Sequence, residues 1–380
     1  MKNIPYSRQS IDDSDIQAVV ETLKGDFLTQ GPQITAFEEA LKRYLNVSEV
    51  IVVSNGTSAL HLSYLALDLK DAVVFTSPIT FAATSNMLHA VGAQVQFVDV
   101  DPQTGLMDVE SLKENLQALH TSKRLAIVPI SLQGISADLP AIHDLAKQYN
   151  ASVVEDAAHS LGAEYTVQNN TYKSASCAHS DLATLSFHPL KSICCAEGGA
   201  VTCNDAALAQ KVRLLRNHGL AKQDNSYART QLYWGYNYRM TDLQAALGIS
   251  QLKRLPFFLS RRKSIANRYY ERLSEEPYCH FIKASPMVAG SAHHLFVIHF
   301  NDEKARDFAY HFLHDNGIET QVHYQPLYQF DLYKQWLSEM HLPGVEQYYR
   351  GCLSIPIYPK LSENDQDYIL DILAKCCNQL

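Results

Sequence analysis

The stretch Val50-Ile51-Val52-Val53-Ser54-Asn55-Gly56-Thr57-Ser58-Ala59 decides the fold class of this chain. Its first four residues are continuously apolar and branched at Cβ, which is typical of a strand buried on both faces of a parallel sheet. The six residues that follow combine a tight-turn glycine with hydroxyl and amide side chains, a pattern that opens a helix. A strand that leads at once into a helix predicts the βα unit of an α/β protein.

The same alternation continues along the first two thirds of the chain. Apolar periodicity predicts a helix over residues 33–45, and Asp138 followed by Pro140 predicts the start of another. Because strands alternate with helices, we expect a mainly parallel sheet with helices on both faces. The further strands are expected at Ala72–Thr76, Val95–Val98, Leu125–Ile130, Ser152–Glu155, Leu182–Phe187 and Gly199–Cys203.

The pattern changes after about residue 240. Residues 241–273 are predicted to form one long helix with a kink or break at Pro256, because proline lacks the amide that a helix interior needs. We expect a large domain over residues 1–250, which includes an N-terminal arm, and a small C-terminal α+β domain over residues 251–380. The expected elements of the small domain are strands at Leu295–Phe300 and Ile318–His323, and helices over residues 302–315, with Gly317 as the left-handed residue beyond the end, and 363–377.

Composition and charge exclude several classes of protein. The chain has 380 residues, of which 46% are apolar and 19% charged, as in an ordinary globular protein. No apolar run reaches the roughly 18 residues that a membrane span needs, and the N-terminal stretch Met1–Pro5 has no apolar leader core. The net charge is −8 without a basic block, so neither nucleic acid nor a membrane is an expected partner. We expect a cytoplasmic protein.

The eight cysteines are expected to be reduced and buried. Cys194-Cys195 and Cys376-Cys377 are adjacent pairs, and the others are scattered. No pair has the C-x-x-C spacing that is typical of a zinc ribbon or a thioredoxin-type site, so no metal is expected. A disulfide scaffold is typical of short secreted chains, whereas a free cysteine usually behaves as a small buried hydrophobe.

Polar side chains follow two of the predicted strands. Thr57 and Ser58 open a helix, and a helix N-terminus with free N–H groups suits a phosphate, although a plain capped turn has the same pattern. Asp156 ends a strand, where ligands of open α/β folds bind. A carboxylate there needs a cation or hydrogen-bond donors, and capping of the next turn is the alternative.

A third motif, Ser186-Phe187-His188-Pro189-Leu190-Lys191, follows another strand. A lysine beside apolar and cysteine side chains can have the lowered pKa that a lysine nucleophile needs, whereas a lone lysine is ordinarily a solvated surface charge. The phosphate-suited turn, the strand-end Asp156 and Lys191 together match the needs of pyridoxal 5′-phosphate: a phosphate cup, a carboxylate for the ring nitrogen and an amine for the aldehyde. Phe81 could stack on the ring.

Taken as a set, these stretches resemble the DegT/DnrJ/EryC1/StrS sugar aminotransferases, which are fold-type I enzymes that use pyridoxal phosphate. The resemblance runs from about Ile4 to the last helix and implies their α/β fold with a smaller C-terminal domain. The order of the motifs is highly specific. They are Leu28–Pro32, Asn55–Leu60, Thr80–Thr84, Glu155–His159, Ser186–Lys191, Glu197–Ala200, Gly235–Asp242 and Gln244–Gly248.

The resemblance implies catalytic roles for two residues. Lys191 would bond covalently to the cofactor aldehyde and then shuttle a proton, and Asp156 would pair with the ring nitrogen and keep it protonated. The family pattern also implies that Phe81 stacks on the ring and that His159 lies near the ring oxygen.

Further cofactor contacts are implied around the phosphate. Thr57, Ser58 and Ser186 would hold it. In the family, the residue matching Asn237 reaches the phosphate from a second subunit, and the residue matching Arg239 belongs to the same segment. The resemblance therefore implies a homodimer with shared active sites, and makes Arg239 a candidate substrate contact within a locally basic pocket.

The family's usual reaction moves the amino group of L-glutamate to a nucleotide-linked keto sugar. One subgroup of dehydratases has histidine at the lysine position, and Lys191 argues against it here. The stretches His159–Tyr165 and Gln321–Tyr328 resemble the subgroup of the pseudaminic acid pathway, which aminates C4 of UDP-2-acetamido-2,6-dideoxy-β-L-arabino-hexos-4-ulose. Enzymes of bacillosamine, legionaminic acid or aminoarabinose type share much of the pattern and remain alternatives.

Three residues are candidates for contact with the nucleotide sugar, namely His188, His323 and Tyr324; a structural histidine is the alternative for the first two. A non-catalytic regulatory protein on the same fold is a second hypothesis, which the joint presence of the motif residues disfavours. An enzyme acting on an amino acid is a third. It would need an arginine for the substrate carboxylate in the small domain, and Arg306 and Arg350 lie in no recognisable motif.

Overall fold

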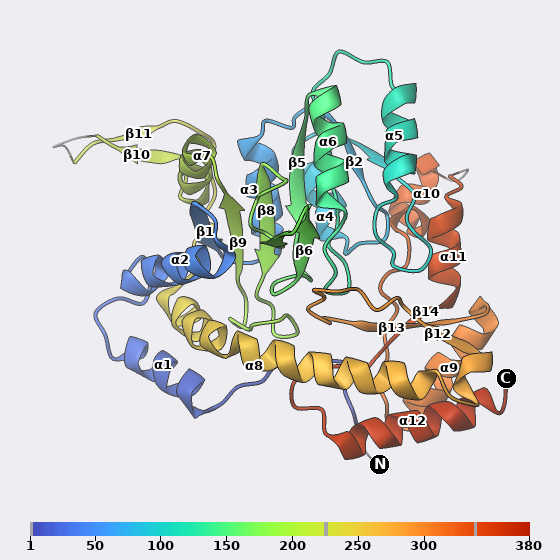
Figure 1. Ribbon diagram of the computed structural model, residues 1–380. Coiled ribbons are helices and arrows are strands. Elements are labelled where there is room, and N and C mark those ends of the chain that lie inside the picture. Colours follow the sequence, from blue (N-terminus) through green and yellow to red (C-terminus); the bar gives the residue numbers. More distant parts are fainter. Residues whose placement is uncertain (1–2, 224–226, 338–339) are drawn as a thin grey trace.

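The computed structural model describes residues 3–223, 227–337 and 340–380, so Met1 and Lys2 of the N-terminal stretch lie outside it. Its centre is a seven-stranded sheet in the order β1-β9-β8-β5-β4-β2-β3 (Figure 1). The seven strands are β1 (Glu49–Val53), β2 (Val73–Thr76), β3 (Gln94–Phe97), β4 (Leu125–Val128), β5 (Ala151–Asp156), β8 (Leu182–Ser186) and β9 (Gly199–Cys203).

All seven strands predicted for the sheet are present, with ends shifted by two residues or fewer. The pairs β3–β2, β2–β4, β4–β5 and β5–β8 are parallel. Strand β9 is antiparallel to both of its neighbours, β8 and β1, which makes the sheet mainly rather than wholly parallel. The carboxyl ends of β5 and β8 therefore lie at the same edge of the sheet.

Both faces of the sheet are buried. In β1, Ile51 and Val53 pack into the apolar cluster of one face, whereas Val50 and Val52 pack into the cluster of the other. This alternation follows from the two-residue period of a strand. The first face is covered by α3 (Gly56–Ala66), α4 (Ala83–Ala90) and α7 (Ala206–Arg216), and the second by α2 (Pro32–Leu45), α5 (Val109–Ala118) and α6 (Leu139–Tyr149).

The long helix α8 (Asp242–Leu273) continues through Pro256, so the predicted break does not occur. Its N-terminal part packs against α1 (Asp13–Leu23) and α2, and its C-terminal part contributes Ile265 and Tyr269 to another core. The packing of both ends of α8 stabilises the helix by more than the loss of one backbone hydrogen bond at Pro256 destabilises it. Figure 1 shows α8 running beneath the sheet and linking the two parts of the chain.

The C-terminal part contains the expected α+β elements except for one strand. A three-stranded antiparallel sheet has the order β12 (Ile282–Ala284), β13 (Phe296–Phe300), β14 (Cys352–Ile355). The predicted strand at Ile318–His323 makes only two isolated bridges, to Ile4 and to Ser354. The helices are α9 (Glu303–Asp315), α10 (Asp331–Leu337), α11 (Pro343–Gly351) and α12 (Glu363–Cys377), with short 3-10 helices η1 (Tyr278–His280) and η2 (Leu327–Gln329).

Two hairpins were not anticipated. They are β6 (Glu164–Val167) with β7 (Asn170–Lys173), and β10 (Leu220–Lys222) with β11 (Arg229–Gln231), which projects from the body of the molecule in Figure 1. In the first, Gln168 and Asn169 both have positive φ angles, the conformation of the tight turns that favour hairpins.

The cysteines, all of which lie in the described part of the chain, form no disulfide among themselves. All eight cysteines are free thiols, seven of them buried and only Cys279 exposed.

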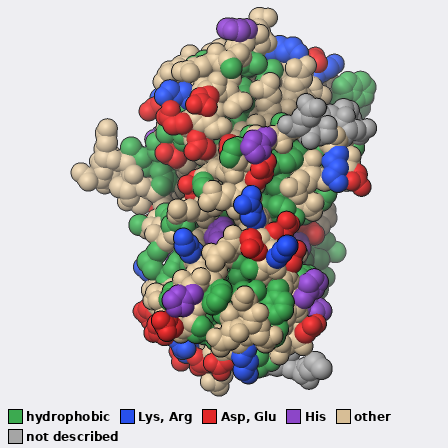
Figure 2. All heavy atoms as spheres, turned by 90° about the vertical axis from the view of Figure 1, so that its right-hand side faces the viewer, with side chains coloured by type: hydrophobic (Ala, Val, Ile, Leu, Met, Phe, Trp, Pro, Cys, Tyr) green, Lys and Arg blue, Asp and Glu red, His purple; other side chains and the backbone are tan. Residues whose placement is uncertain are grey.

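On the face shown in Figure 2, acidic and basic side chains lie beside one another among apolar ones. Within the described residues, no helix combines the length and apolar character needed to cross a bilayer, and no cluster of side chains suits a metal ion.

Candidate active site

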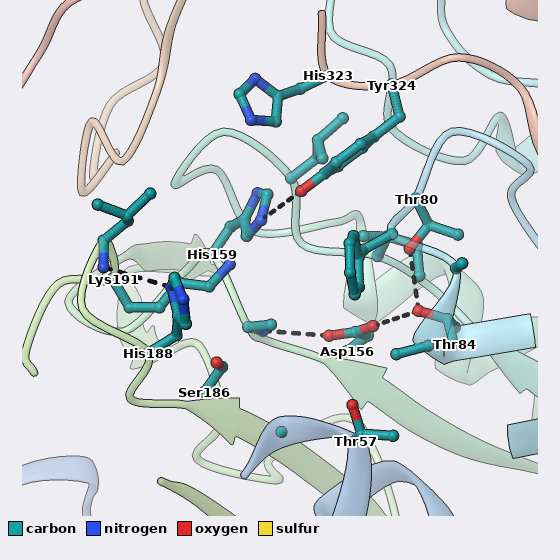
Figure 3. Close-up of a pocket in the computed structure, with 18 of the residues that line it drawn as sticks. Thr57, Thr80, Thr84, Asp156, His159, Ser186, His188, Lys191, His323 and Tyr324 are labelled. Carbon is teal, nitrogen blue, oxygen red and sulfur yellow. Dashed lines mark hydrogen bonds between the residues drawn. The ribbon is translucent and has the colours of Figure 1, made fainter. Parts of the chain in front are cut away.

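A cavity of about 770 Å³ opens at the carboxyl ends of β5 and β8. The N-terminal two thirds of the chain contributes the turn before α3, the start of α4 and the loop after β8. The C-terminal part contributes His294 and residues 321–325. The cavity therefore lies where the two parts of the chain meet, with its polar side chains drawn together in Figure 3.

Asp156 lies at the base of the cavity as the last residue of β5. Its Oδ2 accepts a hydrogen bond of 2.7 Å from Thr84 Oγ1, which is itself 2.9 Å from Thr80 Oγ1, and its Oδ1 accepts one of 3.2 Å from the amide of Ala158. Burial raises the pKa of Asp156, while these donors and the charge of Lys191 oppose the rise. A cationic group bound here would favour the ionised carboxylate.

Lys191 projects into the same cavity from the loop after β8. Burial lowers the pKa of its amine to about 8, against a smaller opposing effect of Asp156. At pH 7 this leaves about a tenth of the amine neutral, compared with roughly one part in 3000 for an ordinary lysine. A partly neutral amine of this kind can act as a nucleophile.

The turn before α3 has free amides that could bind an anion. Gly56 and Thr57 open the helix, and none of the described groups of the chain accepts a hydrogen bond from their amides. A Cβ at Gly56 would come within 3.0 Å of Ser186 Cβ, and one at Gly199 within 2.5 Å of the Asn55 backbone, so these segments touch. Free amides at a helix N-terminus beside two hydroxyl groups suit a phosphate.

A cluster of rings forms the opposite wall. His159 Nε2 and the Tyr324 hydroxyl share a hydrogen bond of 3.1 Å, and His323 Nδ1 bonds to Ser354 Oγ at 2.8 Å. Burial, followed by the nearby Lys191 charge, lowers the pKa of His159 well below its ordinary value and that of His323 to about 3. Both rings are therefore neutral at pH 7, and none of the described residues hydrogen-bonds to the buried His159 Nδ1.

Two aromatic candidates lie at the mouth of the cavity. Phe81 is 64% exposed although its ring lines the cavity, and its centroid is 6.4 Å from that of Tyr324. An exposed phenyl ring inside a cavity offers a free face for stacking. His188 also lines the cavity and is exposed.

Three predicted site residues do not line the cavity of this chain. The Ser58 hydroxyl is buried and bonds to Asn55 Oδ1 and Ser54 Oγ, both at 2.9 Å, where it completes the helix cap. Asn237 is exposed outside the cavity, and Arg239 Nη1 donates to Asn217 Oδ1 at 2.6 Å. Lys191 is the sole Lys or Arg among the described residues that line the cavity, so one chain does not form the expected basic pocket.

Sequence reasoning assigned no role to several polar residues of the cavity, among them Tyr6, Thr84 and His294. The His294 ring lies 4.5 Å from that of His159. Thr84 belongs to the Thr80–Thr84 stretch that carries part of the family resemblance, and this could have indicated it. Tyr6 and His294 are distant in sequence from every motif and carried no signal.

These residues fit pyridoxal phosphate. Among the described residues the buried Asp156 accepts hydrogen bonds only from Thr84 and the Ala158 amide and forms no ion pair within 4.0 Å. The turn at Gly56 supplies unpaired amides, and Lys191 supplies a partly neutral amine. Within the described residues, the side chains that could hold the cofactor are Thr57, Phe81, Asp156, His159, Ser186 and Lys191.

Comparison with known proteins also indicates an aminotransferase. Residues 9–374 match the model of the DegT/DnrJ/EryC1/StrS aminotransferase family. The chain is 37% identical over 372 residues to the UDP-4-amino-4,6-dideoxy-N-acetyl-beta-L-altrosamine transaminase of Campylobacter jejuni, covering 97% of this chain and 96% of that protein.

Solved structures agree in fold. Helicobacter pylori PseC, described as an aminotransferase involved in the biosynthesis of pseudoaminic acid, superposes with a TM-score of 0.92 and 31% identity, covering all of both chains. A putative sugar aminotransferase of Streptococcus pneumoniae in its PLP form has a TM-score of 0.88 and 27% identity, covering 100% of this chain and 99% of that one.

Proposed function

The chain belongs to the DegT/DnrJ/EryC1/StrS aminotransferase family and is a pyridoxal-phosphate-dependent sugar aminotransferase; from this premise we propose its substrates. We infer that it moves the amino group of L-glutamate to C4 of UDP-2-acetamido-2,6-dideoxy-β-L-arabino-hexos-4-ulose, in pseudaminic acid biosynthesis. The relative from Campylobacter jejuni, matched along nearly its whole length, is named for the product of this reaction.

One structural observation carries the choice of sugar. The stretches His159–Tyr165 and Gln321–Tyr328, which bear the likeness to this subgroup, are more than 150 residues apart in the chain. They meet in the cavity through the hydrogen bond between His159 Nε2 and the Tyr324 hydroxyl. The two stretches therefore form a single wall where a sugar would lie, with His323 and His188 as further proposed contacts.

The proposed roles of the catalytic residues follow from their surroundings. When bound, pyridoxal phosphate supplies an electron-withdrawing ring that stabilises negative charge on the reacting carbon. Asp156, held by Thr84 and the Ala158 amide, would hold a proton at the ring nitrogen. Lys191 Nζ, with its lowered pKa, would bind the aldehyde carbon and move a proton at neutral pH. Thr57 and Ser186 would orient the phosphate.

We further propose a cytoplasmic homodimer whose partner subunit completes each site. Asn237 and Arg239 lie outside the cavity of their own chain, and Asn237 is exposed, as a residue that serves a neighbouring subunit must be. An additional cation from the partner would compensate for the single lysine in the cavity. The proposed domain division near residue 250 falls inside α8.

The test is an absorbance spectrum of the purified protein with pyridoxal phosphate, followed by L-glutamate and then the UDP-linked keto sugar. We expect a near-violet band that glutamate shifts and that the keto sugar restores, with the 4-amino product identified by mass spectrometry and NMR. Lys191→Ala is the control and should show neither change. Restoration only by a keto sugar of the bacillosamine or aminoarabinose type would refute the proposed substrate and leave the family assignment intact.

A further inference from the structure

We propose that Gln251 is a positioning residue that holds the Lys191 loop in place by tying it to an N-terminal arm, residues 7–15. The inference rests on the proposed function of Lys191, because a fixed loop matters only if that amine must meet the cofactor aldehyde. Gln251 lies on α8, is 1% exposed and does not line the cavity, so it touches neither cofactor nor substrate.

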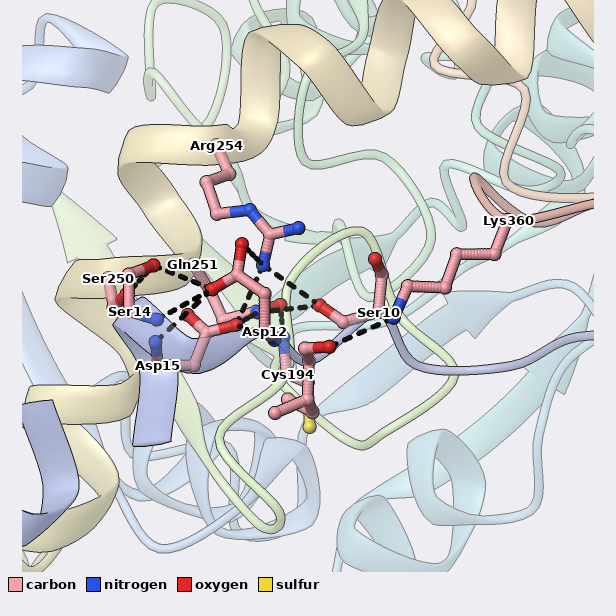
Figure 4. A network of polar contacts seen from close by, with 10 residues as sticks. Ser10, Asp12, Ser14, Asp15, Cys194, Ser250, Gln251, Arg254 and Lys360 are labelled. Carbon is pink, nitrogen blue, oxygen red and sulfur yellow. Dashed lines mark hydrogen bonds and ion pairs between the residues drawn. The ribbon is translucent and has the colours of Figure 1, made fainter. Parts of the chain in front are cut away.

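Gln251 uses both ends of its amide, as Figure 4 shows. Its Oε1 accepts a hydrogen bond of 3.3 Å from the amide of Cys194, three residues after Lys191. Its Nε2 donates to Asp15 Oδ2 at 2.6 Å and to the Ser10 carbonyl at 3.0 Å. One buried side chain thus bonds to the loop and to the arm at the same time.

The arm is itself firmly held. Asp15 is fully buried, and its Oδ2 also pairs with Arg254 Nη1 at 2.7 Å. Arg254 donates in addition to the Ser10 carbonyl at 3.2 Å, and Lys360 Nζ donates to the Ile11 carbonyl at 2.9 Å. A buried carboxylate that is bonded by two donors from α8 makes the arm a fixed support rather than a loose end.

Helix α8 lies along the loop at more than one point. Gln244 Nε2 donates to the Glu197 carbonyl at 2.8 Å, and a Cβ at Gly248 would come within 2.8 Å of Cys195 Sγ. Gln244, Gly248 and Gln251 follow the i, i+4, i+7 spacing of one helix face. That face therefore lies alongside the second half of the loop, with the two segments running in opposite chain directions.

The first half of the loop also contacts the arm, because Ser7 Oγ donates a long hydrogen bond of 3.5 Å to the Leu190 carbonyl. Lys191 is thus flanked by two attachments, at residues 190 and 194, and both lead to residues 7–15. Removing the stronger attachment should leave the fold intact and let the loop open, so that the amine is less well oriented and more hydrated.

The decisive variant is Gln251→Met, which keeps the side-chain length and removes both hydrogen-bonding ends. We measure amide hydrogen exchange in the cofactor-free protein and the pH midpoint of the near-violet band in the loaded protein. The expected results are exchange about tenfold faster at the Cys194 amide and a shifted pH midpoint, since the buried amide loses its acceptor and Lys191 gains water.

Gln366→Met is the matched control. Gln366 is 2% exposed and donates to the Ile265 carbonyl at 3.0 Å, far along the chain from the Lys191 loop. We expect this variant to be destabilised similarly and to change neither readout. If Gln251→Met fails to fold, Asp15→Asn weakens the same arm without shortening a side chain and should speed exchange at Cys194 in the same direction.

Two outcomes would overturn the proposal. They are exchange at Cys194 within twofold of the wild-type rate in Gln251→Met, and an equal change in both glutamine variants, which would indicate general destabilisation. A wild-type protein that forms no near-violet band with pyridoxal phosphate would instead refute the proposed function. The exchange measurements on the cofactor-free chain would still decide whether Gln251 holds the loop.

Discussion

The substitution Thr84→Val tests whether the hydrogen bond from the Thr84 hydroxyl to Asp156 controls cofactor binding. Valine has nearly the same shape as threonine and removes only the hydroxyl that donates to Asp156 Oδ2 at 2.7 Å. A hydrogen bond to a charged group contributes about 1.5–3 kcal/mol. Its loss should raise the pKa of Asp156 further, in addition to the rise that burial already causes, because the ionised carboxylate loses a donor.

A higher pKa means that more of the Asp156 carboxyl is protonated near neutral pH and cannot pair with a cationic ring nitrogen. We therefore expect pyridoxal phosphate to bind about 10- to 100-fold more weakly at pH 6–7, by the same energy range. The loss should become smaller as the pH rises, because a higher pH favours the ionised Asp156 carboxylate in both proteins. The assay is a cofactor titration followed by absorbance at pH 6, 7, 8 and 9.

Thr202→Val provides the control. The Thr202 hydroxyl is fully buried and donates to the Ala175 carbonyl at 2.8 Å, away from the cavity. It should lower the melting temperature about as much as Thr84→Val and leave the cofactor affinity unchanged. Affinity within twofold of wild type at every pH in Thr84→Val would refute the argument that this hydroxyl controls the charge of Asp156.

Three further predictions concern the same cavity. Asp156→Asn should fold normally by circular dichroism and lose most of its turnover, because a neutral amide cannot hold the ring-nitrogen proton; an unchanged rate would remove Asp156 from that role. Acylation of Lys191 in the cofactor-free protein should titrate with a midpoint near pH 8, because burial lowers its pKa to about 8; a midpoint above pH 10 would contradict this. Mixing Lys191→Ala and Asn237→Ala chains should partly restore activity through one intact site per heterodimer, and proven heterodimers without activity would argue against shared sites.

The central sheet could be predicted because a buried strand has a recognisable local sequence pattern. Short apolar runs indicate strands that are buried on both faces, and each of the seven runs forms a strand of the sheet. The same logic placed Asp156 and Lys191 together, since parallel strands β5 and β8 bring their carboxyl ends to one edge. The short strand β3 is the least buried of the seven, as expected at the edge of the sheet.

The sequence by itself determined the α/β class, the strand ends that carry the chemistry and, through the motif order, the resemblance to a sugar aminotransferase family. Only the tertiary structure decided which candidates meet. It carried α8 through Pro256, set Tyr324 against His159 and brought Gln251 between the arm and the Lys191 loop. Apolar periodicity and helix capping involve only a few neighbouring residues, so they can be recognised in the sequence. Contacts between residues more than a hundred positions apart depend on the path of the whole chain, which no local pattern records.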